Sequence, residues 1–424
     1  MMLHSIVAQQ LYFPPNIGTT WDTLAPSTLG YCPNQIDSLY DYLENTDSKA
    51  FILLKDGKIV LEKYFGTFTQ DSVWYWASAG KSLTACLVGI AQQEGHLSIE
   101  DTTSQYLGAG WTAATPAQEQ AITIKSQLSM TTGLDDGVPE VDCTLDTCLQ
   151  YLTPPWTRWA YHNAPYTLLD QVIEQATGRT ITTYFFQKLR QTIGMTGTYL
   201  RVGYNNVFFS KPRSMARFGL LALNQGNWNG TTIVDSTYFG AMTNSSQNIN
   251  PSYGYLWWLN GKSSHMLPRL PFSLNGSINP HAPNDAFMAM GKDGQAVNVV
   301  PSQNLVWIRM GNSPNNSLIL HTYNDTIWMK INELVCSPIA TTTLESHSNT
   351  QVFPNPTSHQ IQVQSQQLIQ SWQLYNHLGQ VVQQQATTLG DNFQIDLSQQ
   401  AQGCYYLQLW YEQGVSSRHV VVKQ

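Results

Sequence analysis

Residues 76–84, Trp-Ala-Ser-Ala-Gly-Lys-Ser-Leu-Thr, decide how this sequence is interpreted. The GKS at their centre matches the end of a phosphate-binding loop. Such a loop needs a glycine five residues before Gly80, because its bare main-chain amides wrap the phosphates. That position holds Tyr75, so no nucleotide loop is present here. Two residues earlier the stretch contains Ser78-x-x-Lys81, a hydroxyl with a lysine one helical turn later. This pair is either a nucleophile with its base or a helix start with an ordinary surface lysine.

The composition narrows the class of protein. The 424 residues are enough for two or three domains with a sizeable core. A net charge of −7 without a basic run argues against nucleic acid as a partner. No apolar run approaches the roughly 20 residues that a transmembrane helix needs. None of the six cysteines forms C-x-x-C and no H-E-x-x-H is present, so we expect neither a metal nor another cofactor.

The N-terminus, MMLHSIVAQQLYFPP, has a short apolar patch but no basic residues ahead of it. It resembles the tail of a secretory signal whose front is missing, with a cleavage point near residues 7–9. An unstructured extension explains it equally well. If the protein is exported, Cys143 and Cys148 could close a small loop. Cys86 lies on the apolar face of an expected helix, where a small core residue is needed.

The pattern of apolar residues predicts an α+β unit. Two apolar runs flank Asp56-Gly57, which is a strong hairpin signal, and a helix follows from Ser78. A long, mainly helical region comes next, with helices expected over 166–177 and 214–223. Strands at both ends of a unit with helices between them indicate that its two ends meet in one sheet. The later elements are strands at 286–290, 296–300 and 305–309 and a helix at 326–335.

The composition changes after Cys336. A Ser- and Thr-rich stretch indicates a linker, and short alternating strands after it predict a small immunoglobulin-like β-sandwich without catalytic residues. These strands are expected at 360–364, 371–375, 380–385, 393–397, 404–411 and 418–423. The predicted division of the chain is an N-terminal extension (1–29), a catalytic domain (30–336), the linker (337–351) and the sandwich (352–424).

Two further motifs follow the serine–lysine pair in order. The first is Tyr161-His-Asn163, ahead of an amphipathic helix, and the second is Lys292-Asp-Gly294, between two strand-like runs. Together the three resemble the S-x-x-K, Y-x-N and K-T-G motifs of the serine β-lactamase and penicillin-binding-protein superfamily. The class C β-lactamase-like serine hydrolases, which include esterases and amide hydrolases, are the most similar. The resemblance covers roughly residues 30–336 and implies an antiparallel sheet flanked by helices, plus an all-helical region.

The resemblance also implies the catalytic roles. Ser78 attacks the substrate carbonyl and becomes acylated, and its main-chain amide forms an oxyanion hole with that of Gln295. Lys81 and Tyr161 act as general acid and base, with Tyr161 in a phenolate-like state beside two lysines.

The remaining motif residues are expected to bind substrate. Asn163 would orient Lys81 and the scissile group, and Lys292 would supply positive potential, with Asp293 and Gly294 completing its motif. Asp293 departs from the hydroxyl residue of K-T-G that helps relatives bind the carboxylate of β-lactams. A carboxylate there would repel an anionic substrate by about 1 kcal/mol or more. We therefore expect β-lactams to be poor substrates and neutral or cationic esters and amides to be preferred.

Several activities remain compatible with these motifs. The first expectation is hydrolysis of a small-molecule ester or amide. The alternatives are a D,D-peptidase or D-aminopeptidase acting on peptides, a true β-lactamase, and a sensor that is acylated once and does not turn over.

The C-terminal unit carries a resemblance of its own. Its segments VFPNP (352–356), LYNHLGQV (374–381) and GCYYL (403–407) are similar to the type A sorting domain of the type IX secretion system. The resemblance implies transit through the periplasm of a Gram-negative bacterium and secretion or cell-surface display. The secretion machinery would bind residues 352–424, and residues beyond about 350 could be removed afterwards. A generic carbohydrate-binding sandwich is the alternative.

Overall fold

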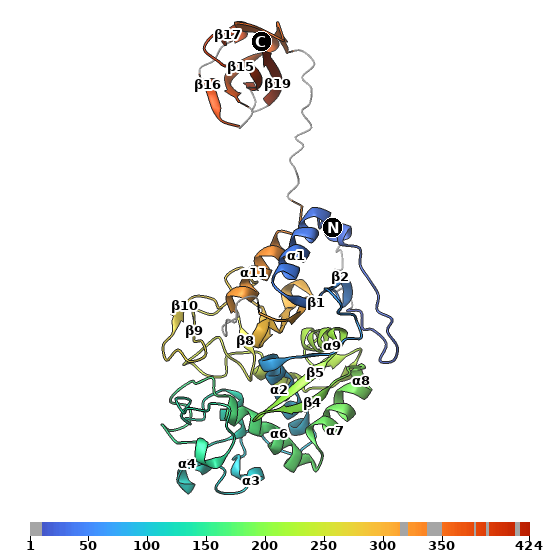
Figure 1. Ribbon diagram of the computed structural model, residues 1–424, viewed down its shortest axis with the longest axis vertical. Coiled ribbons are helices and arrows are strands. Elements are labelled where there is room, and N and C mark those ends of the chain that lie inside the picture. The colour runs from blue at the N-terminus through green and yellow to red at the C-terminus, as the bar shows by residue number, and fades with distance from the viewer. Residues whose placement is uncertain (1–10, 314–320, 337–349, 377–378, 387–389, 412–415) are drawn as a thin grey trace, which may run out of the picture. The chain divides into compact units, whose positions relative to one another are not determined.

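The structure is a computed structural model that describes residues 11–313, 321–336, 350–376, 379–386, 390–411 and 416–424 (Figure 1). The chain separates into two compact units, Met1–Cys336 and Ser337–Gln424, which are described one at a time. The signal-like residues 7–9 and residues 337–349 of the expected linker lie outside the described residues.

The first unit is built on an antiparallel sheet with the strand order β2-β1-β13-β12-β11-β8. β1 (Ser48–Lys55) and β2 (Lys58–Tyr64) form the hairpin expected at Asp56-Gly57. β1 also pairs with β13, with Ile52 opposite Ile308. The prediction that both ends of this unit share one sheet is therefore confirmed. The other strands are β8 (Trp258–Leu259), β11 (Phe287–Met290), β12 (Ala296–Val300) and β13 (Leu305–Gly311).

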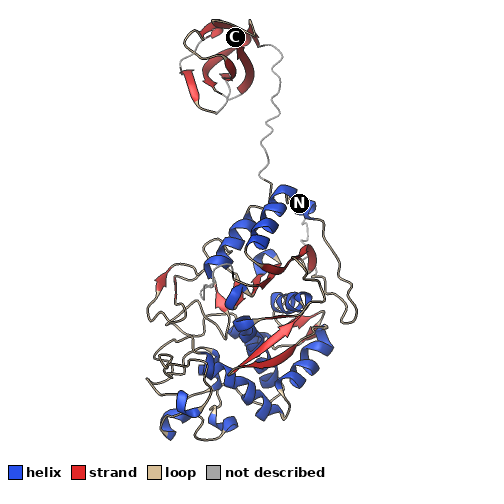
Figure 2. Ribbon diagram, in the orientation of Figure 1, coloured by secondary structure: helices blue, strands red, loops and turns tan. Residues whose placement is uncertain are grey.

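Helices cover both faces of this sheet (Figures 1 and 2). α1 (Pro33–Asn45) and α11 (His321–Asn332) pack together on one face, and α9 (Pro212–Leu223) packs on the other. Successive residues of a strand point to opposite faces. In β1, Phe51 therefore joins the α1–α11 core, while Ile52 joins the larger core on the α9 side. Because both faces are buried, β1 is a nearly continuous apolar run.

The helical region packs beside this sheet around α2 (Gly80–Gln93), which is buried from Gly80 through Ala91. The region also contains α3 (Ser104–Leu107), α4 (Pro116–Gln120), α5 (Ile124–Leu128), η3 (Asp146–Cys148), α6 (Asn163–Thr177), α7 (Ile181–Phe185), η4 (Phe186–Arg190), α8 (Gln191–Ile193) and α10 (Ser236–Met242). Of these, α6 and α10 contact α2 most. Smaller sheets join β3 (Trp74–Tyr75), β5 (Asn205–Ser210) and β4 (Thr198–Val202), then β6 (Asn227–Trp228) and β7 (Thr231–Thr232), and finally β9 (Ser264–His265) and β10 (Leu274–Asn275). Short 3-10 turns lie at η1 (Pro26–Leu29) and η6 (Pro301–Gln303).

Two disulfides close the first unit. Cys143–Cys148 forms the small loop considered from the sequence, and Cys32–Cys336 joins the start of α1 to the end of the unit across 304 residues. Two main-chain hydrogen bonds lie beside this second disulfide: Cys32 N donates to Leu334 O, and Cys336 N donates to Gly30 O. Cys86 is buried in the core, as expected.

The second unit is an all-β domain whose strands curl around one apolar core. Its central strand, β15 (Gln360–Tyr375), was expected as two separate strands. No glycine or proline interrupts it, and Ile361, Val363 and Ile369 stay on the buried side, so pairing continues. The first part of β15 pairs with β14 and β17, and its last part pairs with β16 and β18. The other strands are β14 (Gln351–Phe353), β16 (Val381–Gln385), β17 (Gly390–Asp396), β18 (Gly403–Tyr411) and β19 (Ser416–Lys423).

Candidate active site

Ser78 lies on a sharp turn that leads into the buried helix α2. The sequence predicted that the helix begins at Ser78, but residues Ala77–Ala79 form a 3-10 turn (η2) and α2 begins at Gly80. Ala77 has a φ of 46°, in the left-handed region that non-glycine residues rarely adopt. Such strain is held in place by the surrounding fold and is concentrated at functional sites.

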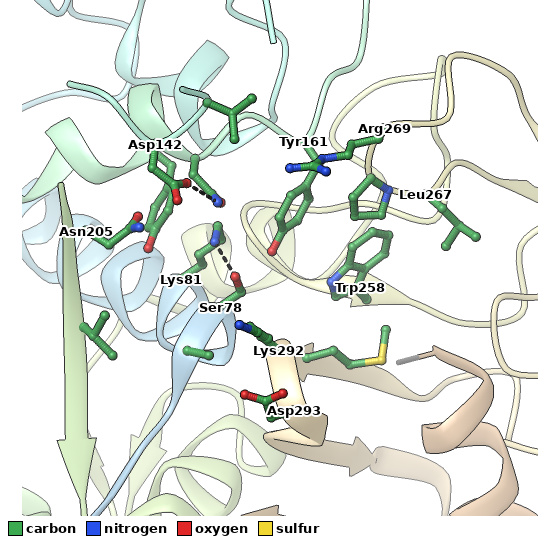
Figure 3. A pocket seen from close by; sticks show the side chains of 18 of the residues that line it. Ser78, Lys81, Asp142, Tyr161, Asn205, Trp258, Leu267, Arg269, Lys292 and Asp293 are labelled. Carbon is green, nitrogen blue, oxygen red and sulfur yellow. Dashed lines mark hydrogen bonds between the residues drawn. The ribbon is translucent and has the colours of Figure 1, made fainter. Parts of the chain in front are cut away.

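Lys81 reaches back from the first turn of α2 to this serine. Its Nζ donates a hydrogen bond of 2.7 Å to Ser78 Oγ (Figure 3). The side chain is only 2 % exposed, and its Nζ lies 4.0 Å from the centre of the Tyr166 ring and 4.9 Å from that of Tyr161. Burial lowers the pKa of Lys81 to about 7, against an opposing effect of the Asp142 carboxylate. A neutral amine is therefore accessible near pH 7, as a general base requires.

Tyr161 completes the group around Ser78 (Figure 3). Its ring stacks on Trp258 with centroids 5.7 Å apart, and the edge of Tyr253 lies against it. Burial raises the pKa of the Tyr161 hydroxyl, and a hydrogen bond with Ser78 lowers it by less. This direction favours a neutral hydroxyl over the phenolate-like state expected from the sequence. Lys292, the second lysine of that expectation, is exposed, so water screens its charge.

Asn163, which was expected to orient Lys81, is the first residue of α6 and lines the same cavity as Lys81. Its Nδ2 donates a hydrogen bond of 2.7 Å to Asp142 Oδ1. Its Oδ1 is buried and has no hydrogen-bond partner among the described residues. The structure therefore brings Asn163 to the site, but bound to a carboxylate that the motifs do not include.

The third motif forms a turn between two strands, as the sequence indicates. Residues Lys292–Gly294 make a 3-10 turn (η5) between β11 and β12, with Asp293 in the left-handed region at a φ of 62°. Gly294 is buried beneath this turn. Asp293 Oδ2 accepts a hydrogen bond of 2.5 Å from the Tyr75 hydroxyl. The Asp293 carboxylate is therefore fixed at the wall of the cavity.

Gln295 is not among the residues that line the cavity. Its side chain is fully buried and makes two hydrogen bonds with the main chain of Gly311. The main chain that lies against the nucleophile is that of Gly291. A Cβ atom at Gly291 would lie 3.0 Å from Ser78 N and 2.6 Å from Trp76 O.

These residues open into a cavity of about 760 Å³, a typical size for a small-molecule site. Within the described ranges, no three His, Cys, Asp or Glu side chains lie together as metal ligands would. None of the described helices is long and apolar enough to cross a membrane. Much of the wall comes from residues for which the motifs give no signal, namely Val141, Asp142, Val202, Val207, Phe209, Trp258, Leu267, Leu270, Ile278 and Met290.

Solved structures with a similar fold share little sequence with this chain. A putative 6-aminohexanoate-dimer hydrolase from Bacillus anthracis has a TM-score of 0.57 at 18% identity, covering 74% of this chain and 87% of its own. A putative beta-lactamase from Bacteroides dorei has a TM-score of 0.57 at 16% identity, covering 72% and 99%. A family VIII carboxylesterase has a TM-score of 0.52 at 14% identity, covering 71% and 98%. The β-lactamase-like fold expected from the sequence is therefore confirmed.

Comparisons of sequence extend this result. An uncharacterised protein of Alkalihalophilus pseudofirmus is 26% identical over 324 residues, which are 66% of this chain and 90% of that protein. A model of the secretion system C-terminal sorting domain matches residues 351–423, which marks the chain for secretion or cell-surface display through the type IX system. A model of the beta-lactamase family, whose members are serine hydrolases, matches residues 41–325. This chain therefore belongs to the beta-lactamase family.

Proposed function

We propose that this chain is a serine hydrolase that cleaves a small ester or amide through an acyl-enzyme on Ser78. The observation that carries the proposal is the 2.7 Å contact between Lys81 Nζ and Ser78 Oγ. A buried lysine with a pKa lowered to about 7 can accept the serine proton near neutral pH. An exposed lysine at the same spacing could not, because it stays protonated.

In the proposed acylation step, neutral Lys81 takes the proton of Ser78 while Oγ attacks the substrate carbonyl. The bond to the leaving group then breaks, and the neutral Tyr161 hydroxyl donates its proton to that group. Lys81 returns its proton to Tyr161, so the acyl-enzyme forms with both residues in their starting states. In deacylation, neutral Lys81 takes a proton from water while the water oxygen attacks the acyl carbonyl. The bond between the acyl carbon and Ser78 Oγ then breaks, and Tyr161 donates its proton to Oγ. The acid leaves, and Lys81 returns its proton to Tyr161.

The oxyanion formed in each step needs two hydrogen-bond donors. The main-chain amide of Ser78 is one, beside the N-terminus of α2, whose dipole favours negative charge. For the second we propose the amide of Lys292 in place of that of Gln295. The supporting observation is the close packing of Gly291 on Ser78 N, because the next amide along the chain is that of Lys292.

The cavity supports a small neutral or cationic substrate. Its walls are largely apolar, and the Asp293 carboxylate stands where an anionic β-lactam would need a favourable partner. Similar folds are found in a family VIII carboxylesterase and a putative 6-aminohexanoate-dimer hydrolase, both of them hydrolases that are not named as β-lactamases. We therefore propose ester or amide hydrolysis ahead of β-lactam hydrolysis.

The test compares hydrolysis of a short-chain p-nitrophenyl ester and of a chromogenic cephalosporin by the wild type and by Ser78→Ala. Turnover of the ester that disappears in Ser78→Ala is expected. Ester turnover that survives in Ser78→Ala would refute the mechanism. Comparable turnover of the cephalosporin would make the protein a β-lactamase. If neither substrate turns over, a D-Ala-D-Ala peptide and single-turnover acylation distinguish the peptidase from the sensor.

We also propose that residues 352–424 deliver the hydrolase to the type IX machinery. The match of the sorting-domain model to residues 351–423 supports this. Deletion of residues 352–424 should leave active enzyme in the periplasm, measured by fractionation and ester hydrolysis. Secretion of the truncated protein at the wild-type level would contradict the proposal.

A further inference from the structure

The cavity contains a carboxylate that forms no ion pair among the described residues. Three aspartates line it: Asp136, Asp142 and Asp293. Asp136 forms an ion pair with Arg158, and Asp293 accepts a hydrogen bond from Tyr75. Among the described residues, the Asp142 side chain has neither an ion pair nor a hydroxyl donor and accepts only the amide hydrogen bond of Asn163. One oxygen of this carboxylate is left for another donor.

A second acceptor lies at the same place. The Nδ2 of Asn163 donates a hydrogen bond to Asp142, and the Oδ1 of the same amide is buried without a partner among the described residues. Native proteins rarely leave a buried polar atom unsatisfied, and such an atom calls for an explanation. A carboxylate oxygen next to an unpaired amide oxygen matches a group with several N–H donors and a positive charge.

The position of Asp142 is fixed by its own segment. Its main-chain amide donates to Glu140 Oε1, and the next residue, Cys143, is buried and disulfide-bonded to Cys148. A prearranged carboxylate loses little conformational freedom when a ligand binds.

The cations of the cavity do not take this role. Lys81 is hydrogen-bonded to Ser78, and Lys292 and Arg269 are exposed, so water screens them. The lining of the pocket also includes apolar side chains, among them Val141, Val207 and Ile278. Such walls suit a methylene chain that leads from the reacting carbonyl to a charged end.

We propose that Asp142 and Asn163 form a subsite for a primary ammonium group carried by the acyl part of the substrate. This inference rests on the proposed Ser78 hydrolase and names its substrate class: ω-amino acyl esters or amides. Asp142 is the specificity-determining residue, and Asn163 supplies the second acceptor. Binding of the ammonium group also offsets the charge of Asp142, which acts on Lys81, His162 and Tyr166.

The test uses matched methyl esters that differ only in the terminal amine. ω-Amino acyl methyl esters of three to six carbons are compared with the alkanoyl esters of equal length, and acid release is measured by titration at constant pH. We expect kcat/KM to be at least tenfold higher for the amine at the best chain length. A ratio of one or below at every length, with turnover that depends on Ser78, would overturn the subsite while leaving the hydrolase intact. Absence of Ser78-dependent turnover on all esters would instead overturn the hydrolase itself.

Two variants assign the preference to Asp142. Asp142→Asn keeps an acceptor for Asn163 and removes the charge, so the ratio of amine to alkyl kcat/KM should fall at least tenfold. Asp136→Asn makes the same change on a cavity carboxylate that Arg158 already neutralises, and the ratio should stay at the wild-type value. An equal fall in both variants, or no fall in Asp142→Asn, would overturn the assignment. A binding test needs no turnover of an amine substrate. The inhibition constants of n-pentylammonium and 1-pentanol are compared for hydrolysis of an alkyl ester by the wild type, and the ammonium compound should inhibit more strongly. Equal inhibition constants would overturn the subsite.

Discussion

Gly291 packs directly on the main-chain nitrogen of Ser78, with space for a hydrogen but not for a methyl group. We expect Gly291→Ala to push the β11–β12 turn away from the nucleophile and to lower kcat by about 10²-fold, the loss typical of one oxyanion donor. Gly240→Ala is the matched control, because no atom lies within 4 Å of its Cβ position. Full activity of Gly291→Ala in a correctly folded protein would show that this packing is dispensable.

The lowered pKa of Lys81 predicts the pH dependence of the reaction. Protonated Lys81 cannot accept the serine proton, so kcat/KM for a neutral ester should rise about tenfold per pH unit below pH 7 and level off above it. Lys81→Met should lose at least about 10³-fold in kcat. Lys292→Ala should leave the inflection of the pH profile at the same pH, since Lys292 is exposed and water screens its charge. An inflection near the usual lysine pKa would contradict the assignment of Lys81 as the base.

Tyr161→Phe separates proton transfer from packing. Phenylalanine keeps the stacking on Trp258 but cannot donate a proton to the leaving group. We expect kcat to fall by about 10²- to 10³-fold with little change in thermal stability. Stopped-flow measurement of the acylation burst checks which step slows. An unchanged steady-state rate would remove Tyr161 from the mechanism.

The charge of Asp293 should set the discrimination against anionic acyl groups. Asp293→Asn is the suitable change, because asparagine tolerates the left-handed conformation at this position, whereas β-branched threonine does not. The ratio of kcat/KM for monomethyl glutarate to that for methyl valerate should rise about fivefold or more. An unchanged ratio would mean that the carboxylate of Asp293 does not contact the acyl group.

The Cys32–Cys336 disulfide should stabilise the catalytic unit. In the chain-entropy model a closed loop of this length contributes about 6 kcal/mol, so changing both cysteines to serine should lower Tm by roughly 10 °C. The site lies elsewhere in this unit, so kcat at 25 °C is expected to persist. A Tm equal to that of the wild type would show that the hydrogen bond from Cys32 N to Leu334 O already holds these ends together.

The sequence predicts this site where the chemistry depends on local spacing. Ser78 and Lys81 are one helical turn apart, so their contact follows once the chain is helical there. Tyr161 and Asn163 were identified by their motif alone. The state of Tyr161 was not predictable, because it depends on Trp258 and Tyr253, which packing brings from almost 100 residues away.

Long-range packing explains the other differences. Gln295 was expected to supply the second oxyanion amide from the strand that follows Lys292–Gly294. Its side chain instead bonds to the main chain of Gly311, and the main chain packed on Ser78 N is that of Gly291. Asp142 belongs to no motif and reaches the site only through the packing of its loop. The partner of Cys32 depends on the two ends of the unit meeting, which no local spacing encodes.

The same disulfide has a mechanical consequence. A pulling force that enters through the chain before Cys32 and leaves through the chain after Cys336 passes along the S–S bond between them. The central sheet and α2 then lie outside the path of the load. Traction on the sorting domain during export could therefore reach the ends of the catalytic unit without unzipping β1 from β13 or separating Lys81 from Ser78.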